Sequence, residues 1–237
     1  MRLVLSCWLI PLTLTPLFST PTWGQERLHP FRATYSATLD TGVAISADAI
    51  RELRQLDDGS WVFDSTANAM VAAQHEQSRF TYGDQGEIRP LSYRYQRQVL
   101  GKERLAELDF DWTGARVTTT VKGKPWQMTI GAGTQDKLSY QLQLRQDLAR
   151  GQKEMRYQVA DGGPLSEYHF RVLGEEIIST PQGDYNTLKV ERVRAKNAGR
   201  TTHIWFAPAL EYLIVKLYQT ESDGKEYGLL LNHLESR

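Results

Sequence analysis

The residues that could do chemistry are spread along this sequence and do not gather at catalytic spacings. No histidine is paired with another histidine or a cysteine at a metal-ligand spacing such as His-x-x-x-His. No Gly-x-Ser-x-Gly elbow occurs, and the single cysteine, Cys7, lies in an N-terminal segment that we expect to be removed. The sequence therefore predicts no metal site, no cofactor and no serine or cysteine nucleophile. The histidines are His29, His75, His169, His203 and His233.

Carboxylates are numerous, but their spacing does not form an acid/base pair. Glu175 and Glu176 are adjacent in an expected strand, so they point to opposite faces and cannot act on one bond together. Glu107, Asp109 and Asp111 share one face of another strand, as on a solvated surface. Hydrolysis of an envelope glycan or lipid is therefore the least favoured function.

Aromatic residues are more informative, because they occur in nearly every expected strand. Most must belong to the core, but some could line a cavity for an apolar ligand, where tyrosine adds a hydroxyl that orients it. We expect the ligand-binding aromatic residues to be Tyr93, Tyr95, Phe110, Trp112, Tyr168, Phe170, Trp205 and Tyr212.

Two arginines complete this candidate site. Arg192 and Arg194 share strand parity with Leu188 and Val190, which places positive charge on a largely dry face. A buried charge must be paired or must face a ligand. Glu175, Glu176 and Glu191 are the candidate partners within the chain, and an anionic ligand head group is the alternative.

The elements that must position these residues are mostly strands. Residues Phe31–Leu39 alternate apolar and polar side chains without a break, and similar alternation returns around Leu108–Trp112, Val117–Val121 and Trp126–Ile130. Turn residues recur about every 8–12 positions, a spacing typical of β-sandwiches and β-barrels. In the C-terminal half we expect six strands at Met155–Ala160, Leu165–Ser179, Thr187–Ala195, Thr201–Ala207, Leu210–Glu221 and Glu226–Leu234. The stretch 68–75 fits a loop or a strand.

One helix is expected at Gln135–Arg150, between Gly133-Thr134 and Gly151, with Asp136 at its N-terminal end. Its apolar side is interrupted by Gln141 and Arg145, which indicates a helix that covers a sheet edge or a barrel mouth.

These elements predict an all-β fold, an antiparallel up-and-down meander that closes into a barrel or a curved half-barrel. About a dozen strands exceed what a twisted open sheet holds without curling. A barrel of more than eight strands begins to be too wide for its own side chains to fill. The expected interior is therefore hollow and lined with aromatic rings.

The N-terminus carries the pattern of a secretory signal peptide. Arg2 precedes an uncharged apolar run, residues 3–18, and Thr22-Trp23-Gly24 offers a cleavage site. We therefore expect residues 1–24 to be a signal peptide and residues 25–237 to form one domain in the periplasm. Without Cys7 that domain contains no disulfide. Lys and Arg total 28, as do Asp and Glu, and this balance argues against a nucleic-acid partner.

The C-terminal half also carries an ordered series of short motifs. They are Tyr157-x-Val159-x-Asp161-Gly162, Tyr168-x-Phe170-x-Val172-x-Gly174-x-Glu176, Thr180-Pro181-x-Gly183, Trp205-x-Ala207-Pro208 and Val215-Lys216. In this order they resemble the bacterial exported family catalogued as domain of unknown function 3108, over roughly residues 30–234. Ile214 stands where the family pattern has a proline. The resemblance implies an envelope β-protein and carries no assigned activity.

Two functional hypotheses follow. The first is a non-enzymatic periplasmic protein that binds or carries an apolar or amphipathic ligand, such as an envelope lipid. The second is an assembly protein whose barrel is packed solid and whose loops meet other envelope proteins.

Overall fold

The computed structural model describes residues 28–40, 44–70, 72–195 and 198–236. These residues form fifteen strands, the helix α1 (Ser139–Ala149) and a short 3-10 helix (Pro208–Leu210). The predicted signal peptide at residues 1–24 lies outside the described residues. Neither helix of the described chain has the length and apolar character needed to cross a bilayer.

The strands join in a single sheet whose order follows the chain almost throughout. All neighbours are antiparallel except β9 and β10, which are parallel. The N-terminal arm contains β1 (Phe31–Asp40), β2 (Ala44–Gln55), β3 (Trp61–Ala69), β4 (Ala72–Tyr82), β5 (Ile88–Val99), β6 (Lys102–Asp111), β7 (Arg116–Val121) and β8 (Lys124–Thr129). The C-terminal arm contains β9 (Gln135–Asp136), β10 (Glu154–Ala160), β11 (Ser166–Thr180), β12 (Gly183–Val193), β13 (Thr201–Ala207), β14 (Leu213–Thr220) and β15 (Glu226–Ser236).

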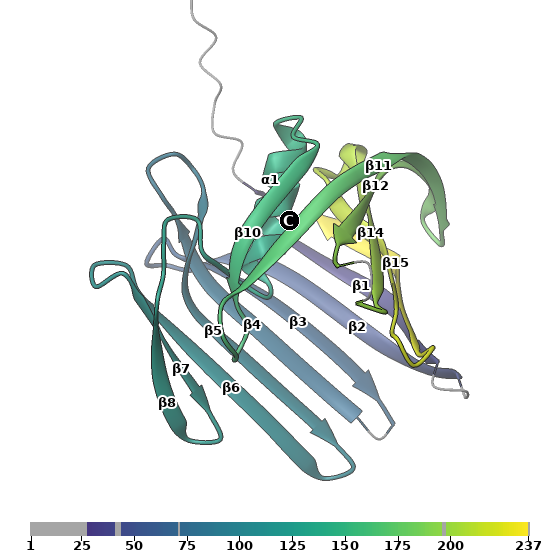
Figure 1. Cartoon of the computed structure of the whole chain (residues 1–237). Coiled ribbons are helices and arrows are strands. Elements are labelled where there is room, and N and C mark those ends of the chain that lie inside the picture. The colour runs from purple at the N-terminus through teal and green to yellow at the C-terminus, as the bar shows by residue number, and fades with distance from the viewer. Residues whose placement is uncertain (1–27, 41–43, 71, 196–197, 237) are drawn as a thin grey trace, which may run out of the picture.

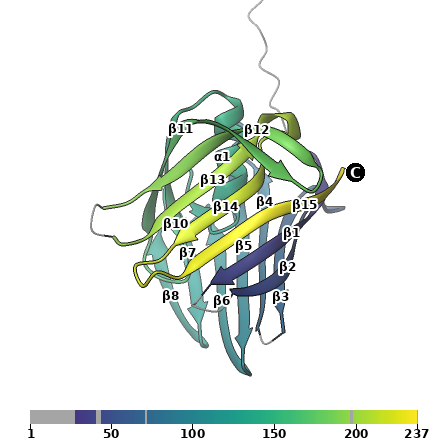
Figure 2. The same ribbon diagram turned by 90° about the vertical axis from the view of Figure 1, so that its right-hand side faces the viewer.

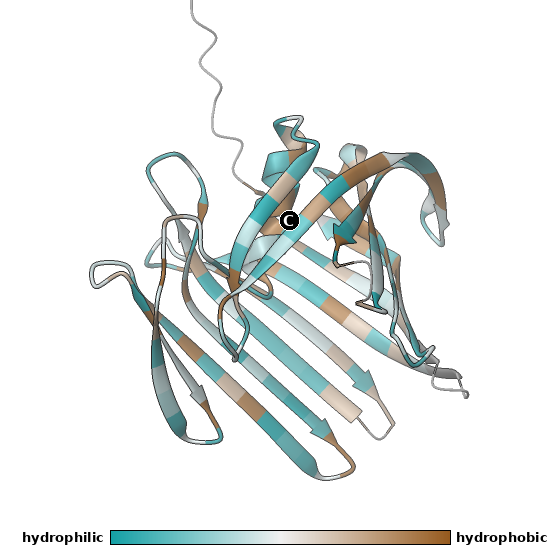
Figure 3. Ribbon diagram, viewed as in Figure 1, coloured by the Kyte–Doolittle hydropathy of each residue, from teal (hydrophilic) through white to brown (hydrophobic). Residues whose placement is uncertain are grey.

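The two arms are joined by the pairing of β1 with β15, and the sheet curves around α1 without closing (Figure 1). Figure 2 shows the same curvature from the side, with the strands of the N-terminal arm extending beyond the helix. Apolar and polar residues alternate along these strands (Figure 3). The predicted all-β meander is confirmed, in its curved, unclosed form.

The stretch 68–75, which fits a loop or a strand by sequence, contains the end of β3 and the start of β4. Two elements begin four residues away from the sequence expectation. β12 begins at Gly183, four residues early, because Pro181 and Gln182 alone make the turn, with Gly183 at φ 120°. The helix begins at Ser139 because the Asp136 carboxylate accepts the backbone N–H groups of Leu138 and Ser139, at 2.7 and 2.8 Å.

The concave face has two ends. At the closed end α1 fills the space between the arms, and inward-facing residues such as Leu53, Phe63 and Phe80 are buried. At the open end the hairpin turns after β3, β5 and β7 extend past the helix (Figure 1). Because the strands are antiparallel neighbours, each contributes to both ends.

Candidate functional site

The helix at the closed end is unusually polar for a buried helix. Gln141, Gln143, Arg145 and Asp147 are all less than 9% exposed. Each has hydrogen-bond partners. Gln143 accepts the backbone N–H of Ile88 at 2.7 Å and donates to Asp147 at 3.0 Å. These bonds fasten the helix to the surrounding sheet, since a buried polar group without a partner is costly.

Two further bonds tie α1 to both arms. Tyr157 of β10 donates its hydroxyl hydrogen to Asp147 at 2.7 Å, and Arg51 of β2 donates to Gln141 at 2.9 Å. Burial raises the pKa of Tyr157, as does the neighbouring Asp147 carboxylate. The closed end is therefore a cross-braced structural centre.

Asp136 anchors the start of the helix. Its carboxylate is fully buried and also accepts a hydrogen bond from the Ser78 hydroxyl at 2.5 Å. Burial raises the pKa of Asp136 to about 6, against the opposing effect of its hydrogen bonds, of which the bond from Ser78 is the largest. This carboxyl group titrates at an unusually high pH for an aspartate.

Arg145 is the buried cation of the closed end. It donates from Nε and Nη2 to the Glu211 carbonyl, at 3.2 and 3.0 Å, and its guanidinium carbon lies 5.1 Å from the Phe31 ring centroid. Burial lowers the pKa of Arg145 to about 10. The residue joins the helix to the turn before β14.

Inward-facing side chains become more accessible toward the open end. On β4 the series passes from the buried Phe80, Ser78 and Glu76 to the half-buried Gln74 and Ala72. The same change occurs on β3, β5 and β12. The concave face is therefore filled beside the helix and accessible beyond it.

Alanines form much of the accessible floor. Ala37 pairs with Ala47 across β1 and β2, and Ala69 pairs with Ala72 across β3 and β4. Ala67, between them, is half-buried as well. The side chains on this part of four neighbouring strands are therefore small and only half-buried.

Arg192 and Arg194 lie on the opposite arm and face inward, as their parity predicted. Arg192 is stacked on Tyr168, with its guanidinium carbon 3.3 Å from the ring centroid, and Arg194 donates to the Thr202 hydroxyl at 3.0 Å. Burial and, to a smaller extent, repulsion from Arg192 and Arg200 lower the pKa of Arg194 to about 10. The described residues provide no ion pair for either Arg192 or Arg194.

Two of the three carboxylates considered as partners for these arginines are engaged on the convex face, and the third, Glu175, pairs in register with Leu188 and forms no ion pair with either arginine among the described residues. Glu191 pairs with Arg171 at 2.5 Å, and Glu176 pairs with Lys189 at 3.1 Å. Because directly paired residues share a face, Arg171 and Glu191 point away from Arg192. The alternative of an anionic partner from outside the chain therefore remains for Arg192 and Arg194.

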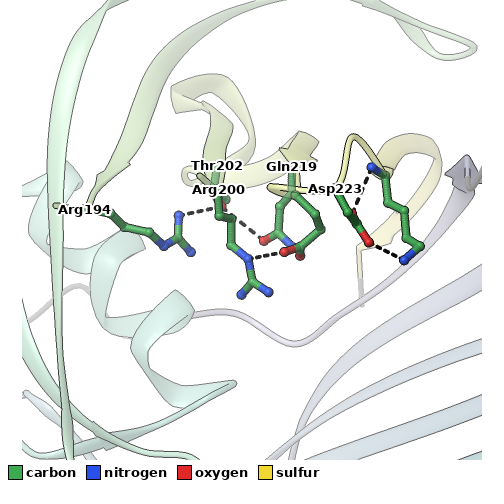
Figure 4. A network of polar contacts seen from close by, with 7 residues as sticks. Arg194, Arg200, Thr202, Gln219 and Asp223 are labelled. Carbon is green, nitrogen blue, oxygen red and sulfur yellow. Dashed lines mark hydrogen bonds and ion pairs between the residues drawn. The ribbon is translucent and has the colours of Figure 1, made fainter. Parts of the chain in front are cut away.

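Arg194 belongs to a polar network at the open end of the C-terminal arm (Figure 4). The Thr202 hydroxyl, which accepts from Arg194, donates to Gln219 at 3.1 Å, and Gln219 donates to Glu221 at 2.6 Å. Glu221 in turn pairs with Arg200 at 2.6 Å. Arg200 therefore has a counter-ion within the chain, whereas Arg194 donates only to an uncharged group, the Thr202 hydroxyl.

A pocket of about 190 Å³ lies where the two arms approach each other. It is lined by Tyr95, Arg104, Ala106, Lys137, Asp161, Gly162 and Gly163. Gly162 has φ +91°, and a Cβ atom there would lie 3.2 Å from the Ala106 side chain, so a glycine allows the turn after β10 to approach β6. Lys137 lies 5.6 Å from the Tyr95 ring centroid.

Positive charge gathers around this pocket. Arg97 of β5 is paired directly with Arg104 of β6, and both side chains are exposed on the concave face. Like charges in direct register destabilise a sheet. Asp161 lies on the other wall, where its carboxylate accepts the Tyr168 hydroxyl at 3.3 Å. A chain of contacts thus links the pocket to Arg192, since Asp161 accepts from Tyr168 and Arg192 is stacked on Tyr168.

The structure brings some of the predicted site residues together and separates others. Tyr95, Tyr168, Arg192 and Arg194 lie on the accessible part of the concave face or at its border. Phe170 is fully buried, and its ring centroid lies 5.4 Å from that of Tyr140 of the helix. Tyr93 is buried too, donating to Glu76 at 2.5 Å, and burial and the Glu76 carboxylate raise its pKa.

Four further predicted residues lie away from this area. Phe110, near the closed end of β6, stacks on Trp112, which follows that strand, with 6.0 Å between the ring centroids, and Trp112 donates to the Pro90 carbonyl. Tyr212 follows the 3-10 helix and packs beside the buried cluster around α1. Trp205 pairs with Lys189 and Lys216 on the convex face and donates to Glu176 at 3.0 Å. No ligand contact tests any of these assignments.

Arg97, Arg104 and Lys137 were not among the predicted residues. The parity signal that selected Arg192 also applies to the two arginines, since Arg97 shares a face with Tyr93 and Tyr95, and Arg104 with Ala106 and Leu108, but it does not apply to Lys137, which lies between β9 and α1. Their direct register could not be read from the sequence.

In the described part of the chain, no three His, Cys, Asp or Glu side chains converge into a group that could hold a metal ion. The accessible part of the concave face can bind an acidic group through its arginines and an apolar group by burying apolar surface against its alanines.

Comparisons with known proteins place the chain in a wider group. A family model described as "Protein of unknown function (DUF3108)" matches residues 31–230. The comparison with curated proteins returns no match.

Among solved structures, a β-barrel-like protein of domain family DUF1849 from Brucella abortus is 13% identical, with a TM-score of 0.60 over 89% of this chain and 99% of that chain. A DUF1329 family protein from Desulfovibrio piger is 9% identical, with a TM-score of 0.31 over 90% and 87%. The first likeness shows a shared fold.

Proposed function

The chain belongs to the DUF3108 family, and we propose that it is a non-enzymatic binding protein of the periplasm that holds an acidic amphipathic ligand, such as an envelope lipid, on its concave face. The ligand lies at the open end, beyond α1. Its acidic head group meets the unpaired arginines, and its apolar part covers the alanine floor.

The observation that carries this proposal is the difference between the arginines of the two faces. On the convex face Arg171, Arg156 and Arg94 each pair with a carboxylate, at 2.5, 2.9 and 3.8 Å. On the concave face Arg192 and Arg194 have no such partner among the described residues. An anionic ligand would relieve the repulsion between them, because a partly buried charge gains more from a partner than an exposed one.

The alanine floor supplies the second part of the binding site. Each methylene that a ligand buries there contributes about 0.8 kcal/mol. A chain of several methylenes could therefore bind tightly with a single acidic group to fix its orientation. Tyr95 and Tyr140 border this region from β5 and α1, and burial raises the pKa of Tyr140 to about 12, so its hydroxyl stays protonated.

Purification after export, lipid extraction and mass spectrometry test the proposal. We expect a stoichiometric acidic amphiphile, and at least a tenfold lower occupancy in the double variant Arg192→Gln/Arg194→Gln. The matched control is Arg156→Gln/Arg171→Gln, which removes the same charge from the convex face and should leave occupancy unchanged. An empty protein that also takes up no acidic lipid from an added extract would overturn the proposal.

The packed closed end supports the second candidate function, an assembly protein that contacts other envelope proteins. In that case the concave face has no ligand, and both double variants leave the extract equally empty. The lipid extraction therefore separates the two functions.

A further inference from the structure

Two large apolar side chains are exposed at the open end of the N-terminal arm. Met70 follows β3 and is 100% exposed, and Leu100 follows β5 and is 76% exposed. Their hairpins are neighbours, because Ala72 of β4 pairs with Val99 of β5. A shallow pocket of about 380 Å³ between them is lined by Ala69, Met70, Ala72, Ala73, Gln98, Leu100 and Gly101, and we call this surface the apolar tip.

The fold itself does not require a leucine at position 100. Leu100 has φ +47°, a left-handed conformation that is costly for a leucine, and Gly101 follows at φ +76°. Two-residue hairpin turns of this kind favour Asn-Gly. A side chain that is strained in its backbone and buries almost nothing in the protein is better explained by contact with something outside it.

Exposed lysines surround the apolar tip. Lys102 begins β6, and Lys122 and Lys124 flank the turn between β7 and β8 at the same end of the sheet (Figure 1). The acidic Glu103 follows Lys102, pairs in register with Gln98 and accepts a hydrogen bond from Gln96 at 2.5 Å. Among the described residues, none of these three lysines forms an ion pair.

The C-terminal arm provides the contrast at the same end. There the charges at the hairpin turns are compensated, because Arg200 pairs with Glu221 and Lys225 pairs with Asp223 (Figure 4), whereas the inward-facing Arg192 and Arg194 have no carboxylate partner among the described residues. Lysines without a carboxylate partner and exposed apolar side chains therefore occur together at the hairpins of the N-terminal arm.

We propose that the apolar tip docks on an anionic lipid bilayer. Met70 and Leu100 enter the interfacial layer of the bilayer. Lys102, Lys122 and Lys124 lie against the acidic head groups, and each lysine raises the affinity for the membrane by about tenfold or less. The mixture of exposed apolar side chains with three lysines against one neighbouring carboxylate, Glu103, matches a lipid surface, where phosphates lie directly above hydrocarbon. Docking in this way would turn the open end of the concave face toward the membrane.

Flotation with vesicles tests this directly. The protein is purified after export, and its intact mass shows whether residues 1–24 have been removed. We expect binding to vesicles of phosphatidylethanolamine and phosphatidylglycerol (3:1), weaker binding in 0.5 M salt and little binding to pure phosphatidylcholine. The variant Met70→Ser/Leu100→Asn should lose at least tenfold in affinity while its thermal stability is kept, because asparagine suits the left-handed turn.

The matched control is Ile177→Asn on the C-terminal arm, which removes an apolar side chain that is 65% exposed and should bind vesicles like the unchanged protein. A second variant, Lys102→Gln/Lys122→Gln/Lys124→Gln, should remove the dependence on salt. Absence of vesicle binding, equal binding by Met70→Ser/Leu100→Asn, or an equal loss in Ile177→Asn would each overturn the proposal. A tip that binds another protein instead would leave the vesicles unbound.

Vesicle docking and ligand occupancy are separate measurements, so either proposal can fail without the other.

Discussion

The closed end and the open end of the concave face are built by the same strands, yet they differ in almost every physical respect. At the closed end large side chains are buried, and Gln143, Asp147 and Asp136 all have hydrogen-bond partners. At the open end alanines replace the large side chains, and Arg192 and Arg194 have no carboxylate partner among the described residues.

This difference shows how one sheet can separate stability from binding. The helix and its hydrogen bonds hold the two arms together at one end, so the other end does not need to be filled. Uncompensated charge is tolerable there because the fold is already stabilised elsewhere. Substitutions at the two ends should therefore have different consequences.

The largest expected effect is at the closed end. Phe80 is fully buried, and its ring centroid lies 6.4 Å from that of Trp61 and 5.9 Å from that of Tyr82. Phe80→Ala should lower the free energy of unfolding by about 3–5 kcal/mol, because it leaves a cavity among rigid rings. Tyr95→Ala, at the half-buried border of the open end, should cost less than about 2 kcal/mol. Urea denaturation measures both, and equal losses would remove the distinction between the ends.

The second effect is a pH dependence from Asp136. Its pKa is raised by burial from 3.8 to about 6, so the folded state binds this proton more tightly than the unfolded state. The stabilisation is fully present below pH 3.8 and is lost as the pH rises through about 6, a change on the order of 3 kcal/mol. Urea midpoints measured between pH 4 and 7 should show this decline. The variant Asp136→Asn should flatten it, and an unchanged slope in that variant would contradict the assignment.

A smaller loss is expected when one brace of the helix is removed. Gln143→Ala leaves the Ile88 N–H without its acceptor and removes a donor to Asp147, which should cost about 1–3 kcal/mol. Gln127 on β8 is exposed and is the control, because Gln127→Ala should change stability by less than about 0.5 kcal/mol. A Gln143→Ala variant as stable as Gln127→Ala would show that the helix is held by its leucines alone.

The smallest effect has the opposite sign. Arg97→Gln removes the direct like-charge pair with Arg104, so the ligand-free protein should gain a few tenths to about 1 kcal/mol. Arg94→Gln on the convex face of the same strand loses a pair with Glu107 and should be neutral or slightly destabilising. Thermal unfolding compares the two. A clear destabilisation by Arg97→Gln would mean that the open end is structural, like the closed end.

By itself the sequence determined the strands, their turns and the faces of their residues, because alternation and turn chemistry are local properties. It also placed Arg192 and Arg194 on the inward face, since parity along one strand needs no knowledge of its neighbours. The order of motifs was enough to indicate the family.

Tertiary structure decided which inward residues are covered. The sequence carries no sign that α1 fills one end only, that Trp205 is buried on the other face of its strand from Ile204, or that Arg97 lies opposite Arg104. Each of these depends on strand register, and on contacts between residues far apart in the chain such as Gly162 and Ala106. Burial is a property of what packs against a residue, and that is fixed only when the two arms come together around the helix.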